Sequence, residues 1–171
     1  YMAQLPGMGV NGNAALKYPV PFSEIHTLSL LQDVQGIPQL LDFGRERGGL
    51  FYAVPMLYPS LEEMLQQRSI DDSGGRISWP AAQGLGLALL AILRAIHARG
   101  VLHGNIKPKN VLVPDGEMWP HLVDFGVARP LADAHFEAGV GGKRDYMSIR
   151  AGTCTGQRKP ADDLESLGWV L

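Results

Sequence analysis

The chain has 171 residues, of which 46% are hydrophobic and 19% charged, with a formal net charge of −2. This length suits one domain, and the composition argues against disordered and collagen-like proteins. The balanced charge gives no indication of a nucleic-acid or anionic-membrane partner. A single cysteine, Cys154, rules out an internal disulfide and favours an intracellular compartment. The longest apolar stretch, residues 85–93, is about half of the ~20 residues that a membrane helix needs, so no transmembrane span is predicted.

The first third of the chain is predicted to contain few regular elements. Residues 1–23 are dense in glycine and proline, which indicates a loop with at most short strands. From Glu24, apolar residues recur at helical spacing until Gly36-Ile37-Pro38 ends the pattern. Residues 51–54 read Phe-Tyr-Ala-Val and lie between chain breakers, which predicts a buried strand.

Helices dominate the prediction after the first third of the chain. Ser60 and Glu63 form a capping box that opens a short helix, and a polar loop is expected over residues 68–78. The strongest helix is predicted from about Pro80 to Ala98, because apolar residues recur there every three or four positions and Gly100 supplies a stop.

Two short strands and a last helix complete the predicted elements. Residues 111–113 and 122–123 flank a turn, so we expect them to pair as a hairpin. A second capping box, formed by Asp162 and Glu165, predicts a helix that begins near Asp162. The chain opens at Tyr1 and closes on Val170 and Leu171 in the middle of an apolar helical pattern without a stop signal, which favours a piece of a longer protein.

A loop rich in ionisable and amide side chains follows the long helix. It reads His103-Gly104-Asn105-Ile106-Lys107-Pro108-Lys109-Asn110, and Asp124-Phe125-Gly126 follows the predicted strand pair. This order resembles the catalytic loop and metal-binding motif of the protein kinases, H-R-D-L-x-x-x-N followed by D-F-G. Because the hairpin after Asn110 brings Asp124 back beside it, an amide oxygen and a carboxylate could share Mg²⁺ on a nucleotide's phosphates. Lys107 could reach the transferred phosphate.

Further motifs resemble one kinase group, the casein kinase I and vaccinia-related kinases. Residues 146–149, Tyr-Met-Ser-Ile, and residues 162–171 match the Y-x-S-I and D-D-L-E-S-L-G-Y-V-L of that group. The resemblance covers about residue 24 to the end. It implies transfer of the ATP γ-phosphate to protein serine or threonine, with ATP and Mg²⁺ as cofactors and a protein substrate or protein partner.

The resemblance also assigns roles to residues around the nucleotide. Glu24 would pair with the nucleotide-positioning lysine, and Val54 would be the gatekeeper. The Pro55 carbonyl and the Leu57 amide would meet the adenine, and Asp163 would belong to the helix that anchors the catalytic loop.

The sequence departs from the kinase pattern at the catalytic loop. Asn105 stands in the position of the catalytic aspartate, and an amide cannot take up the proton of the substrate hydroxyl. Loss of a general base typically costs about 10²–10⁴ in rate. Lys143 replaces the threonine that contacts this aspartate in the family, so Lys107 and Lys143 would face each other. Gly104 removes the arginine that would read a phosphorylated activation segment.

The N-terminal region raises a question of spacing. Residues 7–12 match G-x-G-x-x-G, and residues 14–17, Ala-Ala-Leu-Lys, resemble the strand that carries the kinase lysine. Only four residues separate Gly12 from Lys17, however, too few for a turn and a return strand. A flexible loop is therefore favoured over a phosphate-binding loop. Seven positions from Lys17 to Glu24 are judged too short for a strand, a connection and a helical turn. A surface lysine is therefore favoured over an ion-pair partner of Glu24.

The predicted fold class is α+β, a truncated protein kinase-like two-lobe fold. Residues 1–58 would form an incomplete β-rich N-lobe with the hinge, and residues 59–171 a partial helical C-lobe. The expected catalytic residues are Asn105, Lys107, Asn110 and Asp124, with Asn110 and Asp124 as metal ligands. The expected nucleotide-binding residues are Lys17, Glu24, Val54, Pro55 and Leu57.

Two alternatives to an impaired protein kinase stay open at this point. One is a pseudokinase that binds a nucleotide or a protein partner without phosphotransfer. The other is a small-molecule phosphotransferase, because His103-Gly104 is similar to the H-G-D loop of aminoglycoside and choline kinase-like enzymes.

Overall fold

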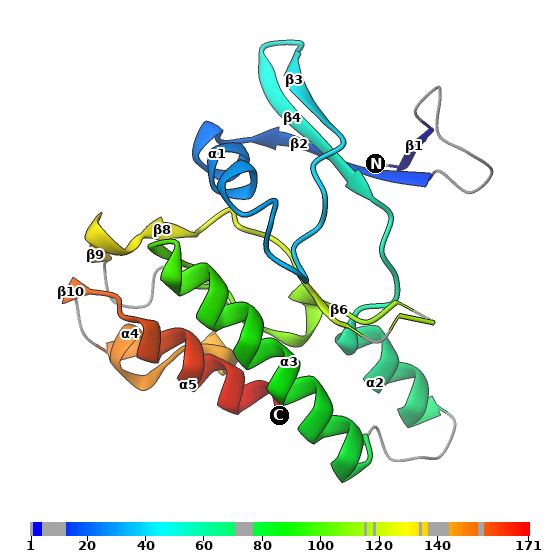
Figure 1. The fold of residues 1–171 in the computed structure, drawn as a ribbon, viewed down its shortest axis with the longest axis vertical. Coiled ribbons are helices and arrows are strands. Elements are labelled where there is room, and N and C mark those ends of the chain that lie inside the picture. The colour runs from blue at the N-terminus through cyan, green and yellow to red at the C-terminus, as the bar shows by residue number, and fades with distance from the viewer. Residues whose placement is uncertain are drawn as a thin grey trace.

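The computed structural model describes residues 2–4, 13–70, 77–114, 116–117, 119–133, 135–136, 144–153 and 156–171. A four-stranded antiparallel sheet and one helix lie at one end of the molecule, and the other four helices lie at the opposite end (Figure 1). This mixed architecture confirms the predicted α+β class.

The sheet has the strand order β1-β2-β4-β3. Its strands are β1 (Met2–Gln4), β2 (Asn13–Val20), β3 (Asp42–Glu46) and β4 (Gly49–Pro55). β3 and β4 form a hairpin whose two turn residues, Arg47 and Gly48, both have positive φ angles. That backbone matches the twist of paired strands, which is why short hairpin turns favour it.

The loop predicted over residues 1–23 is wrong for residues 13–20, which form the longest strand of the sheet. β2 pairs with β1 on one side and with β4 on the other, and Lys17 lies opposite Tyr52. Val20 is the only β-branched residue among its eight residues. The strand therefore depends on its two partners, which local composition does not reveal.

The helix α1 (Phe22–Leu30) follows β2 after a single residue, Pro21. It therefore begins two residues before the predicted start at Glu24. The chain after α1 winds through turns to Gly36, whose carbonyl accepts a hydrogen bond from the Leu122 amide at 2.8 Å. This contact ties the sheet end of the molecule to the helical end.

The helix α2 (Leu61–Ile70) has the predicted capping box. The Ser60 amide donates to the Glu63 carboxylate at 2.8 Å, and the Glu63 amide donates to the Ser60 hydroxyl at 3.3 Å. α2 reaches Ile70, so the loop predicted over residues 68–78 is wrong for residues 68–70; residues 71–76 lie outside the described residues.

The long helix α3 (Trp79–Ala98) confirms the strongest helical prediction. Leu89, Ile92 and Ile96 on its buried face form one continuous apolar core with side chains of α1 and of the strands β6 and β7. By length and apolar composition α3 could also cross a membrane. A core helix of a globular protein passes the same test, and the packed face of α3 is typical of that class.

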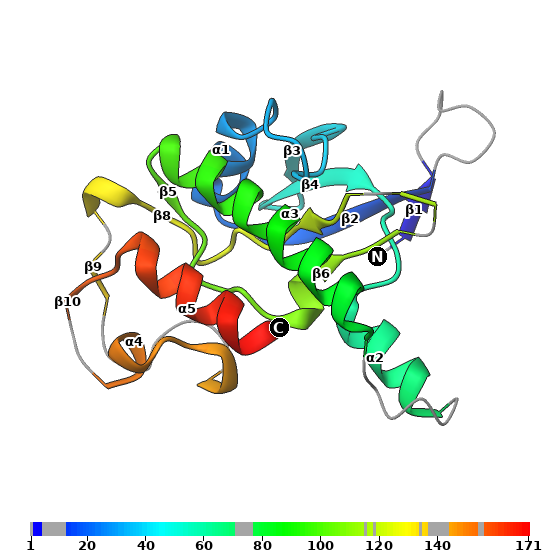
Figure 2. The same cartoon turned by 60° about the horizontal axis from the view of Figure 1, so that its bottom comes forward.

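The last helix, α5 (Pro160–Val170), lies alongside α3 in both views (Figures 1 and 2). The predicted capping box is wrong, and the helix begins two residues before Asp162. Pro160, whose fixed φ suits the first helical position, begins the helix, so Asp162 lies at the third position and accepts the Lys159 amide at 2.7 Å. Glu165 instead accepts the amide of Ile149 at 2.8 Å.

Short elements connect the larger ones. β6 (Val111–Leu112) pairs with β7 (His121–Leu122), as the hairpin prediction requires. The other short elements are β5 (Val101–Leu102), β8 (Arg129–Pro130), β9 (His135–Phe136), β10 (Gly156–Gln157), α4 (Ile149–Thr153) and the 3₁₀ helices η1 (Pro108–Asn110), η2 (Leu131–Asp133) and η3 (Arg144–Tyr146).

Candidate active site

A cleft of about 360 Å³ lies between the sheet and the segment that follows α3. Strands β2 and β4 line one side, and η1 with the residues after β7 line the other. Of the residues predicted from the sequence, those that line the cleft are Lys17, Val54, Pro55, Leu57, Asn110 and Asp124. Glu24, Asn105 and Lys107 are not among the lining residues. The cleft is apolar toward Val54 and Leu57 and polar toward Lys17 and Asp124.

Lys17 connects the two sides of the cleft. Its Nζ lies 2.6 Å from Glu24 Oε1 and 2.7 Å from Asp124 Oδ1. The spacing argument against a Lys17–Glu24 pair is wrong, because β2 passes into α1 through Pro21 alone and no longer connection is needed. Burial alone would lower the pKa of Lys17, but the hydrogen bonds to Asp124 and Glu24 outweigh it and raise that pKa.

Tyr52 is a site residue that the sequence prediction missed. Its hydroxyl donates to Glu24 Oε1 at 2.9 Å, the same oxygen that Lys17 contacts. Glu24 is only 2% exposed, so its carboxylate depends on these donors. Burial, and then the Glu24 carboxylate, raise the pKa of Tyr52. The signal was present in the sequence, since a tyrosine in a buried strand usually needs a partner for its hydroxyl.

Asp163 of α5 holds the backbone of the loop after β5. Its Oδ2 accepts the His103 amide at 2.9 Å and His97 Nε2 at 2.9 Å, and its Oδ1 accepts the Gly104 amide at 2.8 Å. Burial alone would raise the pKa of the Asp163 carboxyl, but the His97 hydrogen bond, together with the two amides, lowers it. A buried carboxylate with three donors fixes the loop relative to α5.

His103 holds the conformation of this loop through its ring nitrogens. Its ring is fully buried, with Nε2 3.0 Å from the Val123 carbonyl and with the Asn105 amide donating to Nδ1 at 3.2 Å. These partners assign the proton to Nε2. Burial lowers the pKa of His103, and the ring of Phe125 packs edge-on against it. The imidazole is therefore neutral and links the loop to the strand that leads to Asp124.

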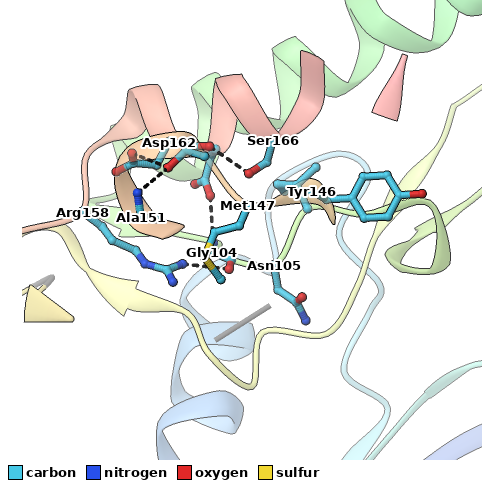
Figure 3. A pocket seen from close by; sticks show the side chains of 11 residues that line it. Gly104, Asn105, Tyr146, Met147, Ala151, Arg158, Asp162 and Ser166 are labelled. Carbon is cyan, nitrogen blue, oxygen red and sulfur yellow. Dashed lines mark hydrogen bonds between the residues drawn. The ribbon is translucent and has the colours of Figure 1, made fainter. Parts of the chain in front are cut away.

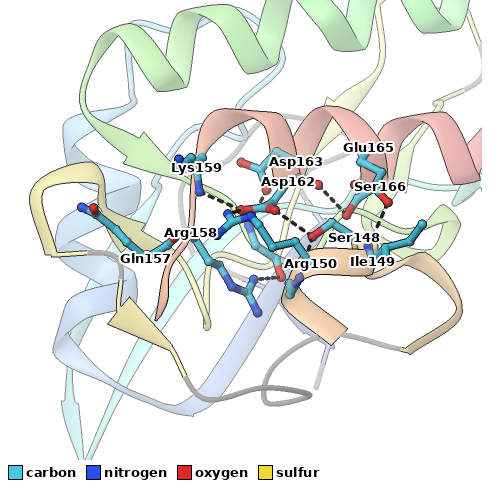
Figure 4. A network of polar contacts seen from close by, with 12 residues as sticks. Ser148, Ile149, Arg150, Gln157, Arg158, Lys159, Asp162, Asp163, Glu165 and Ser166 are labelled. Atoms are coloured by element: carbon cyan, nitrogen blue, oxygen red, sulfur yellow. Dashed lines mark hydrogen bonds and ion pairs between the residues drawn. The ribbon is translucent and has the colours of Figure 1, made fainter. Parts of the chain in front are cut away.

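Arg158 contacts the same loop from the segment before α5. Its Nη1 donates to the Gly104 carbonyl at 2.8 Å (Figure 3). Gly104 has a φ of +72°, and a Cβ there would lie 2.6 Å from Arg158 Nη1. Glycine is required at this position by both the backbone and the guanidinium. Nearby, Asp162 accepts the Ser148 hydroxyl at 2.8 Å and also binds Arg150, which ties α4 to α5 (Figure 4).

Asn105 and Asn110 meet at the Asp124 carboxylate. Asn105 Nδ2 donates to Asp124 Oδ2 at 2.9 Å, and Asn110 Nδ2 donates to the Asn105 carbonyl at 2.9 Å, with the same Asp124 oxygen 3.4 Å away. Asn105 Oδ1 is buried and has no hydrogen-bond partner among the described residues. Figure 3 shows the Asn105 side chain pointing away from Arg158 and Asp162.

Asp124 has a left-handed backbone with a φ of +67°, a conformation that costs a non-glycine residue about 1–3 kcal/mol. Burial would raise the pKa of its carboxyl, but the Lys17 ammonium and, more weakly, the Lys107 charge hold that pKa below its ordinary value. Lys107, within the same loop, is half-buried. Lys143 and the glycine pattern of residues 7–12 lie outside the described residues, so those predictions stay predictions.

As a divalent-cation site, this arrangement fits poorly. Mg²⁺ binds oxygen atoms, commonly those of one or two carboxylates. Here Asn105 and Asn110 turn amide nitrogens toward Asp124, and Lys17 occupies its other oxygen. Among the described residues, no group of three or more acidic, histidine or cysteine side chains could hold a metal ion. Asn110 and Asp124 as metal ligands therefore stay a prediction.

Comparison with known proteins decides the family. The family model of the protein kinase domain matches residues 15–171. The chain belongs to the protein kinase family. The four-stranded sheet and the helices around this cleft are therefore those of a kinase domain.

Casein kinase I homologues are similar to this kinase domain. A probable casein kinase I homolog of Encephalitozoon cuniculi is 35% identical over 156 residues, which cover 87% of this chain and 47% of that protein. A casein kinase I homolog of Kluyveromyces lactis is 30% identical over 161 residues, 86% of this chain and 29% of the relative. Casein kinase I homolog 2 of Saccharomyces cerevisiae is 29% identical over 161 residues, 86% and 28% of the two chains. The chain spans less than half the length of these relatives, and the predicted resemblance to casein kinase I is confirmed.

Proposed function

We propose that this kinase domain binds ATP in the cleft and transfers its γ-phosphate to serine or threonine of proteins, at a rate limited by Asn105. The observation that carries the proposal is the ion-paired Lys17 at the polar end of a cleft that is apolar elsewhere. An ammonium group has three donors, and two of them engage Glu24 and Asp124, so the third can contact a phosphate. The apolar part of the cleft suits a purine ring.

The limited rate follows from the amide of Asn105. The nitrogen of this amide is committed to Asp124, and its oxygen is buried without a partner among the described residues. An amide oxygen can accept a hydrogen bond from a hydroxyl, but this one is covered by its neighbours and does not line the cleft. It cannot keep the proton, and the loss typically lowers the rate by about 10²–10⁴.

A pseudokinase without phosphotransfer is the second candidate, and one observation favours it. The Asn105–Asp124 hydrogen bond joins two positions whose side chains the kinase reaction needs for separate tasks. The match to the protein kinase family over residues 15–171 favours both candidates over a small-molecule phosphotransferase.

Nucleotide binding is tested by titrating the chain with ATP. We expect Lys17→Met to weaken binding by about tenfold or more, because a hydrogen bond to a charged group contributes about 1.5–3 kcal/mol. Lys159→Met is the matched control, since Lys159 is exposed and uses its backbone amide for the cap of α5. ATP binding that is absent, or equal in Lys17→Met and Lys159→Met, would contradict the proposal.

Phosphotransfer is tested with casein as the acceptor. We expect Asn105→Asp to raise the rate of phosphate incorporation by about 10²-fold, because it supplies the missing base. Equal, measurable rates in both proteins would show that Asn105 is not limiting. No transfer by either protein, with ATP binding intact, would favour the pseudokinase.

A further inference from the structure

Both oxygens of the Asp124 carboxylate are already occupied by donors. The Lys17 ammonium lies 2.7 Å from Oδ1, and the Asn105 amide nitrogen lies 2.9 Å from Oδ2. Asn110 adds a second amide nitrogen 3.4 Å from Oδ2. A carboxylate that faces a cation and two N–H donors has its charge largely balanced without a metal ion.

The amide at position 105 is what makes this arrangement possible. With an aspartate in the same place, a carboxylate oxygen would stand 2.9 Å from Asp124 Oδ2, where two negative charges repel unless a cation or a shared proton lies between them. The orientation of the Asn105 amide is fixed by the same contact, because the flipped amide would place two acceptors against each other. With a neutral amide at position 105, no cation is needed to separate two negative charges at this point.

Two cationic side chains line the cleft. Among the described lining residues, Lys17 and Lys109 are cationic and Asp124 is the one carboxylate, and the buried Glu24 carboxylate, which is not a lining residue, lies 2.6 Å from Lys17 Nζ. Lys109 is exposed and its charge acts on Glu63, while the Lys107 charge acts on Asp124. A polyphosphate that enters the cleft can meet both lining ammonium groups.

We propose that the kinase domain binds the phosphates of a nucleotide through Lys17 and Lys109 without needing a divalent cation. This inference rests on the proposed nucleotide binding. Asn105 acts as the positioning residue, because a neutral amide at this position avoids the repulsion between two carboxylates that a metal would otherwise have to screen. Divalent cations then change the affinity little, because the one carboxylate available to them is already hydrogen-bonded.

The test is a calorimetric titration of the full chain with ATP, once in EDTA and once in excess MgCl₂. We expect the two dissociation constants to agree within about threefold in the wild-type chain. In Asn105→Asp, binding in EDTA is expected to weaken by about tenfold or more, and MgCl₂ is expected to restore it. Wild-type binding that is at least about tenfold tighter in MgCl₂ would overturn the inference while leaving the proposed function intact. No ATP binding in either buffer would instead contradict the proposed function.

Two further measurements test the inference without using the ATP affinity of Asn105→Asp. MgCl₂ alone is expected to leave the melting temperature of the wild-type chain unchanged and to raise that of Asn105→Asp, since only the variant gains a carboxylate pair. A rise in the wild-type chain would overturn the inference. Lys109→Met changes an exposed side chain outside the core, so the variant is expected to fold. ATP binding in EDTA is expected to weaken by about fivefold or more, and unchanged binding would overturn the role of Lys109.

Discussion

Replacing Asp163 by asparagine removes the charge that holds the active-site loop against α5. The carboxylate accepts three hydrogen bonds, two through Oδ2 and one, from the Gly104 amide, through Oδ1. An asparagine of the same shape keeps its oxygen best at the Oδ2 position, where His97 and the His103 amide donate. Its nitrogen then faces the Gly104 amide, donor against donor.

The free-energy cost follows from these contacts. Two hydrogen bonds to a charged acceptor become hydrogen bonds to a neutral one, and one buried amide loses its acceptor, which together costs about 3–5 kcal/mol. A domain of this size is stable by about 5–15 kcal/mol, so Asp163→Asn should remove a large part of its stability.

Urea denaturation of the wild type and the variant measures this difference. Asp33→Asn is the matched control, because Asp33 pairs with Arg99 at the surface and exposed pairs contribute little. A cost below about 1 kcal/mol for Asp163→Asn would refute the proposed role of this carboxylate.

Acidification gives a second readout for Asp163. The pKa of its carboxyl is lowered in the folded chain, so its stabilisation is fully present above the unfolded-state pKa of about 3.9. The stabilisation is lost as the pH falls through the folded-state pKa. The stability difference between wild type and Asp163→Asn is therefore expected to be constant near neutral pH and to shrink below about pH 4. A difference that grows on acidification would contradict the sign of this shift.

Three further substitutions probe the parts that position the site. Gly36→Ala should destabilise the chain by about 2–5 kcal/mol, measured by urea denaturation, because φ is +87° there and an added Cβ would clash with Ile92 Cδ1 of α3. An unchanged stability would mean that the contact between residue 36 and α3 rearranges without cost. Tyr52→Phe removes one donor from the buried Glu24 carboxylate and should cost about 1–3 kcal/mol in the same assay, whereas a stabilised variant would show that the hydroxyl is not needed. Ser60→Ala removes the cap of α2 and should cost about 1 kcal/mol, measured by thermal unfolding, and no change in melting temperature would speak against the capping box.

Local chemistry made several parts of this molecule predictable. The Ser60 capping box depends on residues three positions apart, and α3 on apolar residues that recur along one helix face. The pairing of β6 with β7 follows from a short turn between two apolar segments. The error at the start of α5 is also local, since a proline at the first helical position has a stronger effect than the spacing of Asp162 and Glu165.

Contacts between distant segments were not predictable in the same way. β2 exists because two other strands pair with it, and the Lys17–Glu24 ion pair forms because β2 leads into α1 without a loop. Whether the nitrogen or the oxygen of Asn105 would face Asp124 was equally undetermined, because that depends on the donors and acceptors that the fold brings together.

The sequence by itself determined the family and the residue types at the site, since motif identity and order survive without coordinates. It also showed that Asn105 replaces a base. Only the tertiary structure decided that this amide donates to Asp124 and that Lys17 reaches two carboxylates. The reason is physical: the effect of a charged or amide group depends on the atoms within about 3 Å of it, and here those atoms come from segments up to 107 positions apart in the chain.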